Sequence, residues 1–460
     1  MIMRRYELQS IRKKTKRRIF RTAALTLTMG LFLTGCGSRE ANSGAEQGNA
    51  ESVAEGARPN AVNLAAGVKA KELQNTIMQD THRKALSDSA VRLLQKTMEL
   101  EGAPNENYLI SPVSLQMALG MLATGSEDGS ATEKELMELL LPGENAKPEE
   151  MNQEMASLAG RMGSSKGADW NVANSVWVNQ EGHVKLTENY ISDVVSYYGA
   201  ELYEAPFNSE TVKEINGWVN RNTRERIPEI VGELNPQTSV ILLNAMAFDG
   251  TWSVPVPDSH VKEQADFTNA DGSVSKVNML QCEEDAYIRL AGGQGFLKWY
   301  EGGTYAFLGL LPKEGMTTGD YLQKILGDNS SLAEAIRDRD YNAIVEAQFP
   351  EFRTEYGASM NDTLQALGVK KTFTMEAEFG KMITEDSERI AVDQVVHKAM
   401  IEVDRKGTKA AAATEIAVTE AALSEEPVRV QISLDRPFIY GIIDMTTGVP
   451  VFLGAQNNMK

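Results

Sequence analysis

The sequence predicts a mixed α+β fold, for three reasons. Apolar residues recur every three or four positions in the first part of the chain after residue 70, which is typical of helices. Short apolar or alternating runs, typical of strands, dominate the last part. The 460 residues are 42% hydrophobic and 24% charged, the balance of a soluble globular protein, and contain no internal repeat.

Five segments have helical periodicity: 90–98, 111–122, 132–140, 212–223 and 359–367. Pro112 suits the first turn of the second segment, because proline lacks the amide hydrogen that would be unpaired there. Thr132-Glu133-Lys134-Glu135 has the pattern of a capping box, which predicts that the third helix begins there.

Four regions read as strands. Residues 170–178 alternate, whereas 240–248 are almost continuously apolar, as in a strand buried on both faces. Residues 305–311 form another short apolar strand. The runs 439–443 and 450–453 lie on either side of Thr446-Thr447-Gly448 and predict a hairpin.

The charge is unevenly distributed. The formal net charge of −18 and the pI near 4.9 exclude nucleic acid as the main partner. Residues 1–35 nevertheless hold nine basic residues against one acid, a net charge of +8, so the remainder carries −26. The apolar run 22–33 that follows the basic region is too short to span a bilayer, so 1–35 reads as a secretion signal.

The signal ends in Leu33-Thr34-Gly35-Cys36, which resembles the bacterial lipobox, whose cysteine is lipidated and becomes the mature N-terminus. We therefore expect a lipoprotein anchored through Cys36 to the outside of a bacterial membrane, since two or more acyl chains anchor a protein stably. The alternative is an ordinary signal peptide with an incidental cysteine. Residues 36–69, rich in small and polar residues, are predicted to be a flexible tether before a folded domain at 70–460.

Catalytic and metal-binding motifs carry little weight. Gly163-Ser164-Ser165-Lys166-Gly167 matches G-x-S-x-G, but that motif needs a strand before it and a helix after it, and the preceding residues look helical. The four histidines lie far apart in sequence, and there are only two cysteines. We therefore expect neither an enzyme nor a metal or other cofactor, and Cys282 reads as a small hydrophobic residue.

The segment 407–422 is the most informative. Its alternate residues from position 408 onward are all small or apolar: Thr408, Ala410, Ala412, Thr414, Ile416 and Val418. The other set holds both charges of the stretch, Lys409 and Glu415. This alternation predicts a strand with one buried face of small side chains. The alanine run alone would favour a helix or a mobile loop.

The flanks of this segment resemble the serpin family. The resemblance covers roughly residues 80–460 in the right order and rests on the hinge His397-Lys398-Ala399-Met400-Ile401-Glu402-Val403-Asp404 and on the motifs at 107–114, 244–252, 349–352, 435–438 and 448–454. It implies the serpin fold, with three β-sheets, eight or nine helices and an exposed reactive-centre loop at about 405–425.

The resemblance also implies a function. In serpins a target serine protease attacks the loop, forms an acyl-enzyme and is trapped covalently when the loop inserts into the main sheet. The small residues of the hinge favour an inhibitory serpin, which we expect to be monomeric. The alternatives are a non-inhibitory serpin, a surface lipoprotein that binds a small ligand, and a hydrolase acting through Ser165.

Serpin loops usually run seventeen residues from the start of the hinge to the scissile bond. Counted from Arg405, this places the bond between Ala421 and Ala422, a site suited to elastase-like or subtilisin-like proteases. Val418, Thr419 and Leu423 are alternatives for the residue at the bond.

Individual positions carry over from the family. The hinge comprises Arg405, Lys406, Gly407, Thr408, Ala410, Ala411, Ala412 and Ala413. Trp252 matches the tryptophan under the point of loop entry. Ser111, Ser114, Asn244 and His397 match the polar group where the central strands part, here called the shutter cluster; simple packing or helix capping is the alternative for each.

One position departs from the family pattern. Serpins usually begin the hinge with an acid that pairs with a lysine, whereas this chain has Arg405 and Glu351 at these two places. We hypothesise a charge-reversed pair at the loop entry. Two unrelated surface charges are the alternative.

Overall fold

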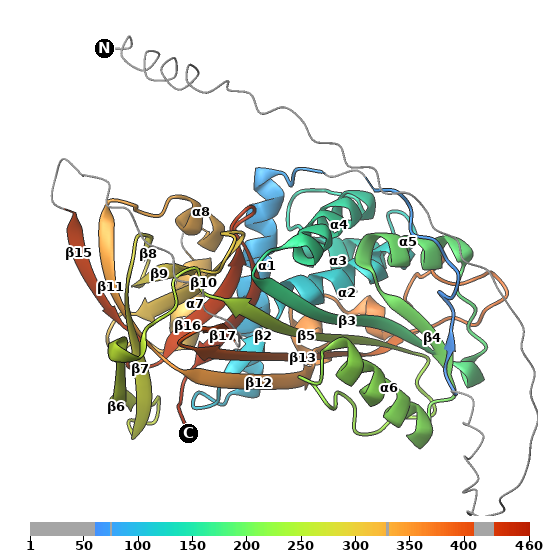
Figure 1. Cartoon of the computed structure of the whole chain (residues 1–460). Coiled ribbons are helices and arrows are strands. Elements are labelled where there is room, and N and C mark those ends of the chain that lie inside the picture. The colour runs from blue at the N-terminus through green and yellow to red at the C-terminus, as the bar shows by residue number, and fades with distance from the viewer. Residues whose placement is uncertain (1–59, 74–75, 328–330, 409–426) are drawn as a thin grey trace, which may run out of the picture. The chain divides into compact units, whose positions relative to one another are not determined.

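The computed structural model describes residues 60–73, 76–327, 331–408 and 427–460, which build nine α-helices and three β-sheets (Figure 1). All of them lie in one compact unit, Arg58–Lys460. Most helices come before residue 223 and most strands after it, so the predicted mixed α+β class is confirmed.

The nine described helices include five that overlap the predicted segments and four, at 148–164, 188–198, 318–326 and 332–337, that were not predicted. The nine are α1 (Asp80–Glu101), α2 (Pro112–Gly125), α3 (Ala131–Leu140), α4 (Pro148–Ser164), α5 (Glu188–Tyr198), α6 (Ser209–Asn222), α7 (Thr318–Leu326), α8 (Leu332–Arg337) and α9 (Asn361–Ala366). Ser111 caps α2 and accepts a hydrogen bond from the amide of Ser114.

The capping box at 132–135 was a wrong prediction. Helix α3 begins one residue before Thr132, and its cap is Ser130, whose hydroxyl accepts from the amide of Glu133 at 3.1 Å. The segment 359–367 was also predicted too long, because Ser359 ends strand β12 (Phe352–Ser359) before α9 begins.

The largest sheet has seven strands in the order β1-β4-β3-β5-β14-β13-β12. Their bounds are β1 (Val62–Asn63), β4 (Glu201–Ala205), β3 (Ala168–Asn179), β5 (Val240–Thr251), β14 (Gly407–Thr408), β13 (Val392–Asp404) and β12 (Phe352–Ser359). Strand β5 is antiparallel to β3 and parallel to β13, so the centre of the sheet is a parallel pair.

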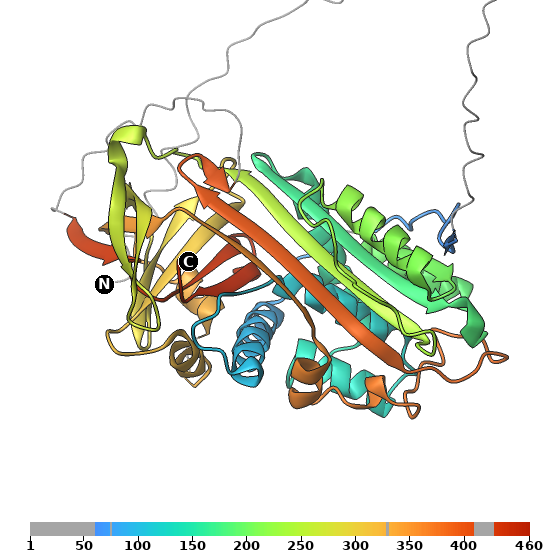
Figure 2. The same cartoon turned by 90° about the horizontal axis from the view of Figure 1, so that it is seen from below.

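Both faces of this sheet are covered, which explains the continuous apolar run of β5. Helix α6 lies on one face and α2 on the other (Figures 1 and 2). Even-numbered residues of β5, such as Met246 and Phe248, join the main core with α2, whereas Ile241, Leu243 and Ala245 pack on the α6 side.

Two further sheets complete the fold. The six-stranded sheet has the order β2 (Tyr108–Ile110), β17 (Val449–Gln456), β16 (Phe438–Asp444), β10 (Tyr305–Pro312), β9 (Gly293–Trp299), β8 (Tyr287–Leu290). The four-stranded sheet has the order β15 (Val428–Ser433), β11 (Ala343–Pro350), β7 (Val274–Glu284), β6 (Val261–Thr268). Strands β16 and β17 pair antiparallel around Thr446-Thr447-Gly448, as predicted.

The predicted tether is wrong in its last part. Residues 36–69 were expected to be flexible throughout, but β1 pairs with β4, and Leu64 and Ala65 pack against the main core. The apolar run at 61–68 is too short to show a clear period. Its order comes from pairing with β4, from the packing of Leu64 and Ala65, and from hydrogen bonds to side chains of α5 and α6. Among the described helices, none combines the length and the apolar character needed to cross a bilayer.

Candidate functional site: the loop entry and the shutter cluster

The hinge enters the large sheet at one end of its central pair. Strand β13 ends at Asp404, the chain turns, and β14 (Gly407–Thr408) runs back between β13 and β5. Thr408 lies opposite Val403 on one side and Gly250 on the other. Strand β14 is therefore a two-residue wedge, antiparallel to both neighbours, at the point where the parallel pair begins to separate.

Four hydrogen bonds fix the turn before the wedge. The Asp404 carboxylate accepts from the amides of Lys406 (2.7 Å) and Gly407 (3.0 Å). The backbone amide of Trp252 donates to the carbonyl of Lys406 at 3.0 Å, and its indole Nε1 donates to the carbonyl of Asp404 at 2.9 Å. Trp252, predicted at the loop entry, thus holds both ends of the turn.

The two residues of the wedge fit very closely. A Cβ added at Gly407 would lie 1.9 Å from the carbonyl oxygen of Gly250, so no larger residue fits without moving the backbone. Thr408 is fully buried, and its hydroxyl forms a 2.5 Å hydrogen bond with that of Tyr300. A small polar side chain is therefore accommodated and paired at the first inserted position.

An aromatic and ionic group supports the wedge from below. Tyr300 stacks on Trp252 with ring centroids 4.5 Å apart. The buried Lys298 lies 5.4 Å from the same tryptophan ring and pairs with Glu284 at 2.8 Å. The Lys298–Glu284 pair, which the sequence analysis missed, compensates charges that would otherwise be costly to bury.

Arg405 lies beside two acids at the entry. Its guanidinium is 2.7 Å from Asp258 and 3.6 Å from Glu351. The hypothesised contact with Glu351 is present, but Asp258 is the nearer partner and has no counterpart in the hypothesis. The Glu351 carboxylate is held in turn by the side-chain amide of Asn278 at 2.9 Å.

Arg405, Asp258 and Glu351 form a charged triad, so exchanging the charges of Arg405 and Glu351 alone should not restore the wild-type arrangement. We expect Arg405→Glu or Glu351→Arg alone to speed premature loop insertion only a few-fold, because Arg405 is 41% exposed and such pairs contribute at most about 1 kcal/mol. The double swap should restore the wild-type rate only in part, since Asp258 would then repel the new glutamate. Adding Asp258→Lys should complete the rescue.

The measurement is the rate at which the intact protein becomes resistant to urea at a fixed temperature. Lys185→Glu is a control for net charge. It reverses the charge of an exposed lysine that pairs with Asp386 and takes no part in the triad. Equal rates for all the variants would mean that the triad has no role in holding the hinge.

The shutter cluster lies across three adjacent strands. Asn174 of β3 is opposite Asn244 of β5, which is opposite His397 of β13. The N-terminus of α2 brings Ser111 and Ser114 beneath this row, and all five residues are buried. Asn174 is the member that the sequence analysis missed, although a polar residue on the inward face of an alternating apolar strand is a signal for it.

Hydrogen bonds join all five members. The Asn244 side-chain amide donates to the Ser114 carbonyl at 2.8 Å and to the Asn174 carbonyl oxygen Oδ1 at 2.6 Å. His397 Nδ1 is 2.7 Å from Asn244 Oδ1, and Nε2 accepts from the amide of Ser111 at 3.0 Å. This pattern requires a neutral imidazole with its proton on Nδ1. The Ser111 hydroxyl donates to the Val451 carbonyl at 2.9 Å.

Burial lowers the pKa of His397 to about 3. The other shutter residues, Ser111, Ser114, Asn174 and Asn244, carry no charge. A protonated His397 would therefore be buried among them without a counterion. The cluster thus closes the β5–β13 junction with neutral hydrogen bonds.

Several predicted site residues lie outside the described part of the chain. They are Cys36, Ala410, Ala411, Ala412, Ala413, Ala421 and Ala422. Cys282, which is described, is a free thiol whose pKa is raised to about 12 by burial, so it stays protonated.

The G-x-S-x-G stretch follows a helix and precedes a strand, the reverse of the order that the hydrolase motif requires. The Ser165 hydroxyl lies within hydrogen-bond distance of the backbone carbonyls of Met162 (3.0 Å) and Ala168 (2.9 Å), to which it donates. It therefore stabilises the turn between α4 and β3. Among the described residues, no group of three or more His, Cys, Asp or Glu side chains could hold a metal ion.

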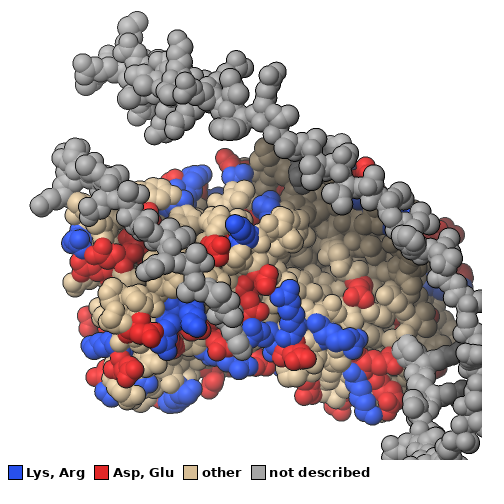
Figure 3. Space-filling view, in the orientation of Figure 1, with Lys and Arg blue, Asp and Glu red and all other residues tan. Residues whose placement is uncertain are grey.

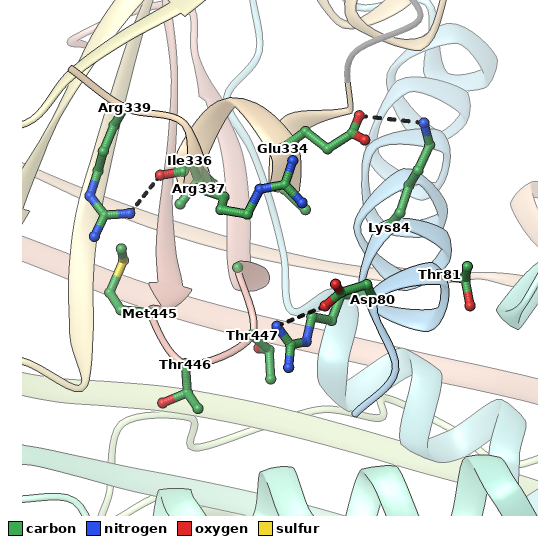
Figure 4. Close-up of a pocket in the computed structure, with 13 residues that line it drawn as sticks. Asp80, Thr81, Lys84, Glu334, Ile336, Arg337, Arg339, Met445, Thr446 and Thr447 are labelled. Atoms are coloured by element: carbon green, nitrogen blue, oxygen red, sulfur yellow. Dashed lines mark hydrogen bonds and ion pairs between the residues drawn. The ribbon is translucent and has the colours of Figure 1, made fainter. Parts of the chain in front are cut away.

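A pocket of about 250 Å³ lies between the start of α1, helix α8 and the turn of the β16–β17 hairpin (Figure 4). Its charged side chains largely pair with one another: Arg83 with Asp80 at 3.1 Å and Lys84 with Glu334 at 3.4 Å. Basic and acidic side chains are likewise interspersed over the face drawn in Figure 3, with no single large basic area there.

Comparisons with known proteins agree with this geometry. The family model described as Serpin (serine protease inhibitor) matches residues 84–459. An uncharacterised serpin-like protein of Thermococcus kodakarensis is 31% identical over 77% of this chain and 82% of its own length. Serpin A3-1 of Bos taurus is 28% identical over 86% of this chain and 96% of its own length.

Solved structures are similar over most of the chain. The thermophilic serpin tengpin in its native state aligns with a TM-score of 0.78 at 30% identity, over 87% of this chain and all of that chain. Tengpin in its latent state aligns with a TM-score of 0.70 at 27% identity, over 84% of this chain and all of that chain.

Proposed function

This chain belongs to the serpin family, with a protease-inhibitor type of function, and from that premise we propose that it is an inhibitory serpin. In this proposal a serine protease is inhibited irreversibly, as a suicide substrate. The protease serine attacks the carbonyl carbon of Ala421, the Ala421–Ala422 bond breaks, and the amino group of Ala422 leaves with the proton. The acylated loop then inserts into the large sheet before water can release it.

The observation that carries the proposal is the register of the wedge. Strand β14 is already paired with both β5 and β13, in the antiparallel sense that a fully inserted loop would have. Continuing the register along β5 sets Ala410 beside Phe248 and Ala412 beside Met246, both on the core face. The small side chains of the loop would thus meet the face where large ones already fill the core.

The register along β13, on the other side of the wedge, leads to the same conclusion about the small residues of the loop. Continuing the register along β13 sets Ala410 beside Ile401 and Ala412 beside Ala399, which also belong to the main core. Thr414 would reach both Asn244 and His397, so a hydroxyl would meet the shutter cluster. A polar residue in an otherwise apolar alternation therefore matches the one polar row of the central strands.

Insertion also has a driving force in this sheet. Val392–Met400 of β13 now pair in parallel with β5, and a new central strand would replace this one ladder by two antiparallel ladders. Thirteen residues, 409–421, would enter, and at about 3.3 Å per residue the acylated end moves on the order of 40 Å. The protease would be carried from the entry to the opposite end of the sheet.

One feature favours this function over the alternatives. The small residues of the hinge continue the register of the wedge along both central strands. We further propose that the chain acts at the outside of a bacterial membrane, held there by a lipid on Cys36.

The test is to incubate the protein with pancreatic elastase and to analyse the mixture on a denaturing gel and by mass spectrometry. We expect a band at the summed mass of the protease and the N-terminal part of the inhibitor, together with a released peptide that begins at Ala422. Elastase is chosen because Ala421 suits a shallow specificity pocket.

Catalytically dead elastase is the control, since it binds the loop but cannot acylate it. Quantitative cleavage without a stable complex would contradict inhibition and favour a substrate-like serpin. A loop left intact by elastase but attacked at a neighbouring residue by other proteases would contradict only the assigned bond.

A further inference from the structure

Residues 60–73, which precede α1, run around the outer edge of the large sheet; we call them the edge clasp. Within it, β1 pairs antiparallel with β4, Val62 opposite Glu204 and Asn63 opposite Tyr203. The amide of Leu64 donates to the carbonyl of Leu202 at 2.8 Å. The edge of the sheet is therefore covered by the chain's own N-terminal segment, in the manner of an added strand.

One end of the clasp is held by α6. The Glu214 carboxylate accepts from two successive backbone amides, those of Asn60 (2.5 Å) and Ala61 (2.8 Å). Hydrogen bonds to an ionised acceptor are stronger than neutral ones, and here a single side chain fixes two amides of the backbone. The start of the clasp is thereby tied to the helix on the outer face of the sheet.

The other end is held by α5, which packs on the opposite face of the sheet with α2 and α4. The ammonium group of Lys71 pairs with Asp193, and its backbone amide donates to the Ser196 hydroxyl at 2.9 Å. Further along, Ser157 of α4 exchanges hydrogen bonds with the backbone of Thr76, at 3.3 and 3.0 Å. The chain is thus attached to α6 on one face of the sheet and to α4 and α5 on the other, and Figure 1 shows the clasp beside β4.

This placement matters because of what must move for a loop to enter. Strand β5 is paired with β3, β3 is paired with β4, and α6 packs on β3. When β5 parts from β13, we expect these elements to move with β5. Helices α4 and α5 belong to the other layer. Any slide of the β3–β4–β5 half past these helices therefore strains or breaks the contacts of the clasp.

We propose that the edge clasp restrains the opening of the large sheet and so slows insertion of the intact loop. The proposal rests on the proposed function, because it concerns the same sheet opening. The clasp begins within the predicted tether, 36–69, so the segment that would lead to the proposed lipid anchor is also the one that stabilises the uninserted state.

The test compares full chains with one substitution each. Glu214→Ala removes the acceptor of both clasp amides, and Asp193→Asn weakens the other end. Glu210→Ala is the matched control, because Glu210 lies on the same helix, is exposed, and pairs at 2.8 Å with Lys213 outside the clasp. Two quantities are measured: amide hydrogen exchange across β4, and the rate at which the uncleaved protein becomes resistant to urea.

We expect Glu214→Ala to speed both exchange in β4 and conversion by about tenfold, Asp193→Asn to do so less, and Glu210→Ala to match the wild type. If both clasp variants become resistant to urea at the wild-type rate, the proposal that the clasp restrains the sheet is wrong. This holds whether or not amide exchange in β4 increases.

A further comparison separates this failure from failure of the proposed function. Wild-type protein cleaved in the loop should gain urea resistance; if it does not, loop insertion itself is wrong and the clasp falls with it. If cleavage does confer resistance and the clasp variants still convert normally, only the clasp is wrong.

Discussion

Replacing Thr408 by arginine is expected to turn the protein from an inhibitor into a substrate. Thr408 is fully buried between β5 and β13 beneath the loop entry, and its only side-chain hydrogen bond is to Tyr300. A guanidinium there would have no counterion, and burying an unpaired charge costs several kcal/mol. The arginine should therefore withdraw the wedge and delay insertion until the acyl-enzyme hydrolyses.

The measurement is the ratio of covalent complex to cleaved protein after reaction with elastase. We expect Thr408→Arg to lower this ratio at least tenfold while leaving the rate of loop cleavage similar. Thr408→Ser, which keeps a small hydroxyl, should behave like the wild type. Lys409→Arg places the same guanidinium on the neighbouring position, where the sequence already has a charge, and should also inhibit normally.

An unchanged ratio in Thr408→Arg would mean that the hinge does not need to enter the sheet through this position. That result would remove the register argument on which the proposed function rests. Loss of inhibition in Lys409→Arg as well would indicate a general sensitivity of the hinge rather than burial of one face.

The sequence predicted those features of the fold that depend on periodicity. The buried strand at 240–248 and the hairpin at 439–453 were predicted because their side chains alternate or cluster in ways that only a sheet explains. The cap of α3 was misplaced because Thr132-x-x-Glu135 satisfies the same pattern as Ser130-x-x-Glu133. Pattern alone cannot choose between two caps two residues apart.

Contacts between distant segments were not accessible in the same way. Asp258 beside Arg405, Asn174 beside Asn244, and Lys298 beside Glu284 all join residues from different strands or loops. The order of the strands and the packing of sheets and turns against one another bring them together. The edge clasp was missed for a related reason, because its partners Glu214, Asp193 and Ser196 lie more than 100 residues away in the sequence.

The second large effect that we expect is a fall in the free energy of unfolding at acid pH, caused by His397 of the shutter cluster. His397 has a pKa of about 3 in the folded protein, because of burial, against about 6.5 in an unfolded chain. Between these values the unfolded state binds a proton that the folded state does not, so the free energy of unfolding falls as the pH falls. The stabilisation is complete above pH 6.5 and is lost progressively below it.

The expected size follows from one proton. Between pH 7.5 and pH 5 the contribution of His397 should fall by about 2 kcal/mol, which urea unfolding at the two pH values measures. His397→Gln cannot titrate, and an amide can both donate toward Asn244 and accept from Ser111. We expect this variant to be less stable at pH 7.5 by about 1–3 kcal/mol and to lose the pH dependence of one proton.

His260→Gln, which removes an exposed histidine at the end of the 3₁₀ turn before β6, should leave the dependence unchanged. An identical slope in His397→Gln and the wild type would show that His397 is not held neutral. The same titration bears on the mechanism, because an opened shutter that exposes His397 to water would bind a proton at pH 5, whereas the closed shutter would not. Acid should therefore loosen the junction that the loop must open, and intact protein should convert to the urea-resistant form faster at pH 5 than at pH 7.5. In His397→Gln this acceleration should be absent, which separates a shutter that opens on protonation from a general weakening of the fold by acid.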